Sequence, residues 1–196
     1  MGIKSFFASA QISWRKRDYH PHTISFPEAI ANAGNVLVCL PVGLRELTLV
    51  KPYLPELADI FSPSEMYLLA SPGSQNIAGI LPRRGYRILV PAAGQSTWSG
   101  LPSGAYLRGL HNSSIDLIVD LNLTMNPFVA RALLDFEDVV KIGVSNILGG
   151  PFYNLEVRTS YLRDERNIYR SLIDTIANLR HPVTRDEHNQ TRLSGM

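Results

Sequence analysis

Short apolar runs of strand length, separated by segments with helical spacing, constrain the fold of this chain most strongly. The clearest run, residues 35–41, is almost continuously apolar and lacks the alternation of a strand with one exposed face. Such a run is typical of a strand buried on both faces, as in a parallel sheet. The predicted strands cover residues 35–41, 65–71, 86–92, 115–122 and 139–145.

The segments between these runs indicate helices. Residues 45–62 have apolar side chains at steps of three and four, but Pro52 and Pro55 predict a kink or a break into two pieces. Residues 126–137 begin with an asparagine and a proline, which favours a helix start. Residues 163–181 form the clearest amphipathic helix.

This order of elements predicts βαβ units and therefore an α/β fold. We expect one Rossmann-like domain over residues 26–182, with an open, mostly parallel sheet and helices on both faces. Residues 1–25 are predicted to form an irregular N-terminal arm. Residues 183–196 have almost no apolar content, which predicts a disordered tail.

Composition narrows the environment and the partners. The 196 residues carry a formal net charge of +2, which predicts no strong field for nucleic acid or an anionic membrane. No apolar run is long enough for a transmembrane segment. Most charges of the N-terminus follow its apolar stretch, the wrong order for a signal peptide, so we expect a cytoplasmic protein. The single cysteine, Cys39, lies in an apolar run and is expected to be a buried small hydrophobe.

Polar residues at strand ends are the first candidates for a functional site. In open α/β sheets ligands bind outside the carboxyl ends of the strands. Asp120 and Asn122 end the predicted strand 115–122, so they could face a crevice there. A hydrogen-bonded turn cap is the alternative interpretation.

Two further segments carry candidates. Gly43 allows a close backbone approach after the first strand, and Arg45 and Glu46 follow where the next helix begins. Glu46 would be a general base at the crevice or an acid that complements the helix dipole. Tyr153 and Asn154 would line the crevice, or the aromatic side chains of this segment would pack beneath a long loop.

Several familiar signatures are missing from the sequence. There is no glycine-rich dinucleotide fingerprint, no phosphate-binding loop of the P-loop type and no nucleophile elbow. His20 and His22 are two histidines in a short arm, a weak signal for a metal site and a pattern more typical of solvated side chains. We therefore predict neither a cofactor nor a metal.

Taken together, three stretches resemble the N-terminal half of glycosyltransferase family 9, the heptosyltransferase-like enzymes of bacterial lipopolysaccharide synthesis. "NVLVCLPVGLRELTLVKPYLPEL" resembles the family's opening strand, glycine turn and proline-containing helix. "IDLIVDLN" resembles an apolar strand ending in an acid and an amide. "VVKIGVSN", "PFYNLEV" and the helix over 163–181 resemble the segment that leads to the family's second domain.

The resemblance implies one half of a two-domain GT-B architecture, the half that holds a sugar or lipid-linked sugar acceptor. It places Glu46 at the position of the family's general base, although a two-residue insertion and a change from aspartate separate the motifs. The family's nucleotide-sugar domain has no counterpart here, which implies an acceptor-side domain that is inactive alone and needs a separate donor domain. The alternative is a stand-alone, non-catalytic domain that binds a sugar, a nucleotide or a protein, with a homodimer as one arrangement.

Overall fold

The structure is a computed structural model that describes residues 2–19, 26–72, 79, 81, 85–145, 147–148, 150–159 and 164–181. Within this part of the chain, six strands form one sheet in the order β3-β2-β1-β4-β5-β6. Each pair of neighbouring strands is parallel. The strands are β1 (Asn35–Cys39), β2 (Glu65–Leu69), β3 (Tyr86–Leu89), β4 (Leu117–Asp120), β5 (Val140–Val144) and β6 (Leu155–Val157). The predicted single, Rossmann-like open sheet is therefore confirmed.

The apolar runs explain the central position of β1. Four of its five residues are buried, because helices cover both faces and neither face meets water. Its register places Cys39 opposite Leu69 of β2 and opposite Asp120 of β4. The carboxyl ends of these three strands are therefore level and open onto one edge of the sheet.

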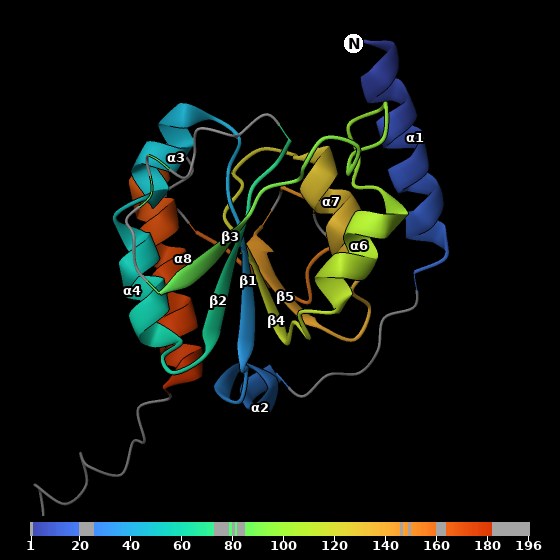
Figure 1. The fold of residues 1–196 in the computed structure, drawn as a ribbon. Helices are drawn as coiled ribbons and strands as arrows, with labels where there is room; N and C mark the ends of the chain where they lie inside the picture. Colours follow the sequence, from blue (N-terminus) through green and yellow to red (C-terminus); the bar gives the residue numbers. More distant parts are fainter. Residues whose placement is uncertain are drawn as a thin grey trace, which may run out of the picture.

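Two helical layers cover the sheet (Figure 1). One layer contains α3 (Leu44–Val50), α4 (Tyr53–Ile60) and α8 (Glu165–Arg180), and α8 packs against both of the others. The opposite layer contains α1 (Ile3–Arg17), α6 (Gly104–His111) and α7 (Pro127–Leu133). The short α2 (Phe26–Ala31) lies at the amino end of β1 and contacts α8. Between each helical layer and the sheet lies a separate cluster of buried apolar side chains.

Local sequence signals account for several helix ends. Pro52 lies between α3 and α4, so the predicted break of residues 45–62 into two helices is confirmed. Asn126 caps α7, since its side chain accepts hydrogen bonds from the backbone N–H groups of Phe128 and Val129, and Pro127 is the first helical residue.

The prediction of an irregular N-terminal arm is wrong for Ile3–Arg17, which form the helix α1. Its inner face is small and short, because only Ala8 and Ile12 are buried, and it packs against α7. With only two buried apolar residues, the sequence of this helix lacks the periodic apolar pattern that indicates a core-facing helix. The strand β6 was also missed, since three residues are too few for a pattern. Predictions for residues 20–25 and 182–196, including His20, His22 and the tail, lie outside the described residues.

Candidate functional site

An open cavity of about 560 Å³ lies where β4, β5 and β6 end and α8 begins. This is the carboxyl edge of the sheet, where open α/β folds bind their ligands. Its volume is within the usual range for small-molecule sites. The lining residues are Leu123, Val144, Ser145, Ile147, Arg158, Thr159, Glu165 and Ile168.

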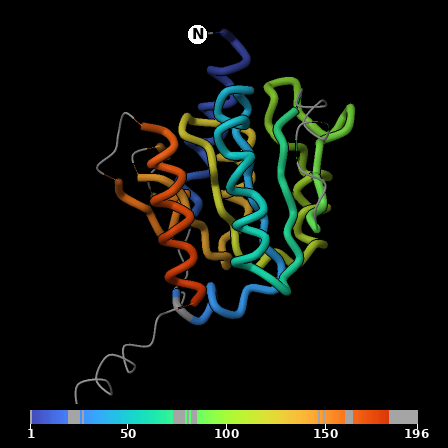
Figure 2. Tube along the Cα trace, turned by 90° about the vertical axis from the view of Figure 1, so that its left-hand side faces the viewer, coloured from blue at the N-terminus to red at the C-terminus, as the bar shows by residue number. Residues whose placement is uncertain are grey.

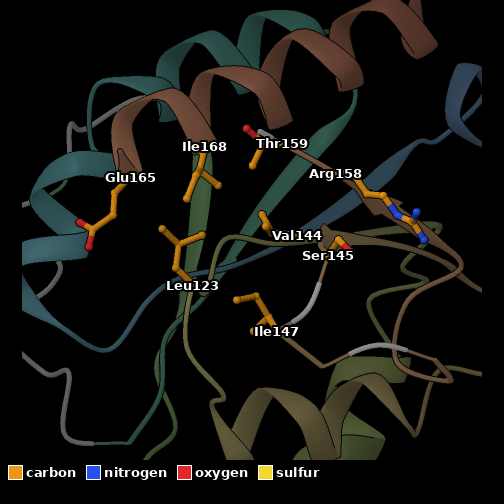
Figure 3. Close-up of a pocket in the computed structure, with 8 residues that line it drawn as sticks. All are labelled: Leu123, Val144, Ser145, Ile147, Arg158, Thr159, Glu165 and Ile168. Atoms are coloured by element: carbon orange, nitrogen blue, oxygen red, sulfur yellow. The ribbon is translucent and has the colours of Figure 1, made fainter. Parts of the chain in front are cut away.

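Apolar and polar side chains divide the cavity (Figure 3). Leu123, Val144 and Ile168 form an apolar middle, with Ser145 beside them. Glu165 lies at one side, on α8, and Arg158 lies at the other, just after β6. The cavity therefore offers an apolar surface between a carboxylate and a guanidinium, a combination suited to a ligand with apolar faces and polar edges.

The start of α8 fixes the position of Glu165. Asp164 caps the helix, because its side chain accepts hydrogen bonds from the backbone N–H groups of Arg166 and Asn167 at 3.1 and 3.4 Å. Glu165 is consequently the first residue of α8. Its Oε2 atom lies 3.2 Å from Nη2 of Arg45. This oxygen is shielded from solvent and accepts no hydrogen bond from the described residues, so the guanidinium of Arg45 is its charged neighbour.

Arg45 and Glu46 lie on α3, which packs against α8. They are beside the cavity and do not belong to its lining. The Glu46 carboxylate folds back over Gly43, and a Cβ atom at Gly43 would overlap it. Glycine at this position leaves room for that conformation. Burial raises the pKa of Tyr169, and the carboxylates of Glu46 and Glu165 raise it further. The hydroxyl of Tyr169 donates to the carbonyl of Leu121, just after β4, at 3.1 Å.

Asp120 and Asn122 lie at the carboxyl edge, but both side chains are buried. Asp120 Oδ1 accepts hydrogen bonds from the backbone N–H and the Nδ2 group of Asn122 at 3.0 and 2.6 Å. Asn126 donates to Asn122 Oδ1 and to Ser71 Oγ, at 3.2 and 2.8 Å. This closed network satisfies the polar groups at the ends of β2 and β4 internally. It has the character of a hydrogen-bonded turn, and neither Asp120 nor Asn122 lines the cavity.

Tyr153 completes this network from the β5–β6 connection. Its hydroxyl donates to Asp120 Oδ2 at 2.7 Å. The ring packs against Gly143 of β5, where a Cβ atom would overlap Cζ and Cε1 of the tyrosine. Burial raises the pKa of Asp120, while the hydrogen bonds from Asn122 and Tyr153 act in the opposite direction. Tyr153 is thus a buried packing residue with a specific polar partner.

Asn154 has a separate place in the structure. Its Oδ1 atom accepts a hydrogen bond from the backbone N–H of Lys141 at 2.8 Å, and its own N–H donates to the Lys141 carbonyl at 2.9 Å. Lys141 is near the amino end of β5. Asn154 therefore joins the start of β6 to the sheet and is not brought together with Glu46 or with the cavity.

The cavity residues that sequence reasoning missed are Ser145, Arg158, Thr159 and Glu165. Ser145 follows β5 directly, so the rule used for Asp120 would have found it. Arg158 and Thr159 follow β6, a strand that was not predicted. The first turn of α8 carried no signal that separated a ligand-facing acid from one that complements the helix dipole.

Two further features concern metal binding and membrane insertion. Among the described residues, no cluster of three or more histidine, cysteine or acidic side chains could hold a metal ion. In the same part of the chain, no helix has the length and apolar character to cross a bilayer. Cys39 is buried, as predicted, and burial together with the nearby Asp120 raises the pKa of its thiol well above the usual range.

No protein-family model matches this sequence, and no curated protein matches it significantly.

Proposed function

We propose that this chain is a glycosyltransferase-like acceptor-side domain that binds a sugar-containing ligand at the carboxyl-edge cavity and does not catalyse transfer alone. The observation that carries the proposal is the cavity itself, with its apolar middle between Glu165 and Arg158. A sugar ring has apolar C–H faces and hydroxyl groups around its edge. Leu123, Val144 and Ile168 suit the faces, while the hydroxyls of Ser145 and Thr159 suit the edge.

Two features of the sequence support the same class of ligand. The stretches that resemble glycosyltransferase family 9 include the strand–glycine–helix segment that carries Gly43, Arg45 and Glu46. The sequence also lacks the fingerprint of an ordinary dinucleotide-binding domain. A lipid-linked sugar fits the proposal equally well, since the recognised group is the sugar.

A thermal-shift panel of monosaccharides, short oligosaccharides and nucleotide sugars tests the proposal. A ligand present at about 100 times its dissociation constant stabilises the native state by about 2.7 kcal/mol. For a chain of this size, that free energy corresponds to a melting-temperature increase of about 5–10 °C. No increase with any sugar would refute ligand binding, and stabilisation by the nucleotide portion alone would contradict an acceptor-side assignment.

Variants then locate the binding site. Thr159→Ala and Arg158→Ala should each reduce the ligand-induced increase, because both side chains line the cavity. Arg87→Ala is the matched control, since Arg87 lies on the opposite edge strand and its guanidinium pairs with Glu65 at the surface. Equal effects of Arg158→Ala and Arg87→Ala would place the ligand elsewhere.

Catalysis would require a donor domain in addition to the domain described here. In that case Glu46 is our candidate general base, supported by its place in the first turn after Gly43 and by its proximity to the region of Tyr169 and Glu165. Transfer in the presence of the donor domain should fall at least about 100-fold in Glu46→Gln, the usual size of a general-base contribution. Unchanged turnover would remove Glu46 from this role, and turnover by the chain alone would refute the claim of inactivity.

A further inference from the structure

The outward face of α1 carries an apolar stripe that the fold leaves uncovered. Residues advance by about 100° along an α-helix, so positions three, four, seven and eleven residues apart share one face. Ala8 and Ile12 define the inner face of α1. The opposite face carries Ile3, Phe6, Phe7, Ala10 and Trp14. Ile3, Phe6 and Trp14 are 75%, 65% and 66% exposed, so this stripe does not contribute to the core.

A loop residue enlarges the stripe into a surface patch. Trp98, which is 59% exposed, lies in the loop between β3 and α6. Its ring makes an edge-on contact with the ring of Phe7, with the centroids 5.1 Å apart. The stripe and Trp98 together are called the α1 patch below. The N-terminal end of α1 extends beyond the rest of the described chain (Figure 2), which gives the patch access to a flat surface.

The helix that carries the α1 patch has only basic charged residues: Arg17 lies beside the stripe, whereas Arg15 and Lys16 lie toward the fold, against Asp135 and the Phe152 ring. Residues 2–17 contain Lys4, Arg15, Lys16 and Arg17 and no acid, and Asp18 follows. Residues 2–18 therefore carry a formal +3, although the whole chain carries only +2. The low net charge that predicted no affinity for an anionic membrane therefore hides a local concentration of basic groups. Arg15 is partly neutralised by Asp135 at 3.5 Å.

We propose that the α1 patch is a docking surface for an anionic lipid bilayer. Aromatic side chains on one face of a helix with basic residues around them favour a position in the headgroup region. Tryptophan is enriched at that depth because its ring is apolar and its indole N–H is polar. Lys4 and Arg17, at the two ends of α1, would meet lipid phosphates. This proposal is independent of the proposed sugar site.

A second copy of the chain is a poorer occupant. In a two-fold symmetric interface the same patch meets itself. Basic residues of one α1 would then face basic residues of the other, and α1 has no acidic side chain to pair with them. An anionic surface complements these charges, whereas a second copy opposes them.

The full chain can be tested with vesicles of phosphatidylcholine alone and with vesicles in which about a third of the lipid is phosphatidylglycerol. The two tryptophans of the sequence, Trp14 and Trp98, both lie in the patch, so intrinsic fluorescence reports directly on it. We expect a blue shift and co-sedimentation with the anionic vesicles, and binding at least about tenfold weaker to phosphatidylcholine. Raised salt should weaken binding, because screening acts on the basic residues.

Variants separate the apolar and the basic contributions. Ile3→Ser/Phe6→Ser retains both tryptophans and should weaken binding more than tenfold, because two side chains no longer enter the bilayer. Lys4→Glu/Arg17→Glu should abolish the preference for anionic lipid. Leu44→Ser is the matched control: Leu44 is 66% exposed but lies on α3, outside the patch. Near-ultraviolet circular dichroism should show that each variant remains folded.

Three results would overturn the proposal. One is the absence of binding to either vesicle. Another is a loss of binding in Leu44→Ser as large as that in Ile3→Ser/Phe6→Ser. The third is a dimer in light scattering that Ile3→Ser/Phe6→Ser converts to a monomer without any vesicle binding, which would assign the α1 patch to self-association.

Discussion

Replacing Tyr153 with phenylalanine removes one hydroxyl group and leaves the ring against Gly143. That hydroxyl donates to Oδ2 of Asp120, a carboxylate that is 1% exposed. Hydrogen bonds to charged groups contribute about 1.5–3 kcal/mol to stability. We therefore expect Tyr153→Phe to lower the free energy of unfolding by that amount, which corresponds to a melting-temperature decrease of about 3–12 °C for a domain of this size.

The loss should depend on pH in a defined direction. Burial raises the pKa of Asp120 above its ordinary value of 3.8, so the ionised form lowers stability as pH rises through the interval between the two values. The Tyr153 hydroxyl stabilises the ionised form, and its removal raises this pKa further. The destabilisation by Tyr153→Phe should therefore be larger at pH 7 than below pH 4, where Asp120 is protonated.

Urea unfolding at several pH values measures both effects, and Tyr106→Phe is the matched control. Tyr106 is also buried, but its hydroxyl has no hydrogen-bond partner among the described residues. Its removal should leave stability unchanged or raise it. In an Asp120→Asn background, Tyr153→Phe should cost only about 1 kcal/mol, the value of a neutral hydrogen bond. Equal losses in both backgrounds, or equal effects of Tyr153→Phe and Tyr106→Phe, would refute the reasoning.

Other perturbations test neighbouring parts of the fold. Gly143→Ala should destabilise by about 1–3 kcal/mol in thermal unfolding, because its methyl group displaces the Tyr153 ring. Cys39 should react with a thiol reagent only in denaturant, since the side chain is buried. Burial lowers the pKa of Lys141 from 10.5 to about 8, so the native state loses this proton before the unfolded state does. Wild-type stability relative to Lys141→Met should therefore rise by about 2 kcal/mol between pH 7 and about pH 9.5, as measured by urea unfolding.

The central strands could be predicted because a strand that is buried on both faces needs apolar residues at nearly every position. The run at β1 is apolar at nearly every position. The proline between α3 and α4 lacks the backbone N–H that a continuous helix would need, so it separates the two helices. The edge strand β6 has three residues, and two of them are only partly buried. Helix α1 directs its largest apolar side chains to solvent. In both cases tertiary placement, rather than local pattern, decides the structure.

The candidate site could be predicted only in its location. The carboxyl-edge rule gives the correct edge of the sheet, where the cavity lies. It does not reveal which polar residues at that edge are used internally. Asp120 and Glu165 are both acids close to the end of β4, yet the first is enclosed by hydrogen bonds and the second lines the cavity. That difference depends on Tyr153, which reaches Asp120 from 33 residues away in the chain.

The closed network also limits where a ligand can be recognised. Ser71, Asp120, Asn122 and Asn126 satisfy one another at the ends of β2 and β4, so a ligand there would have to break buried hydrogen bonds before it formed its own. Recognition is less costly beside β5, β6 and α8, where an open cavity lies outside this network. The contact between Phe7 and Trp98, in the loop after β3, places the N-terminal half of α1 near the same carboxyl edge. A bilayer bound by the α1 patch would therefore lie toward the end of the sheet that carries the cavity, an arrangement suited to a sugar presented on a lipid.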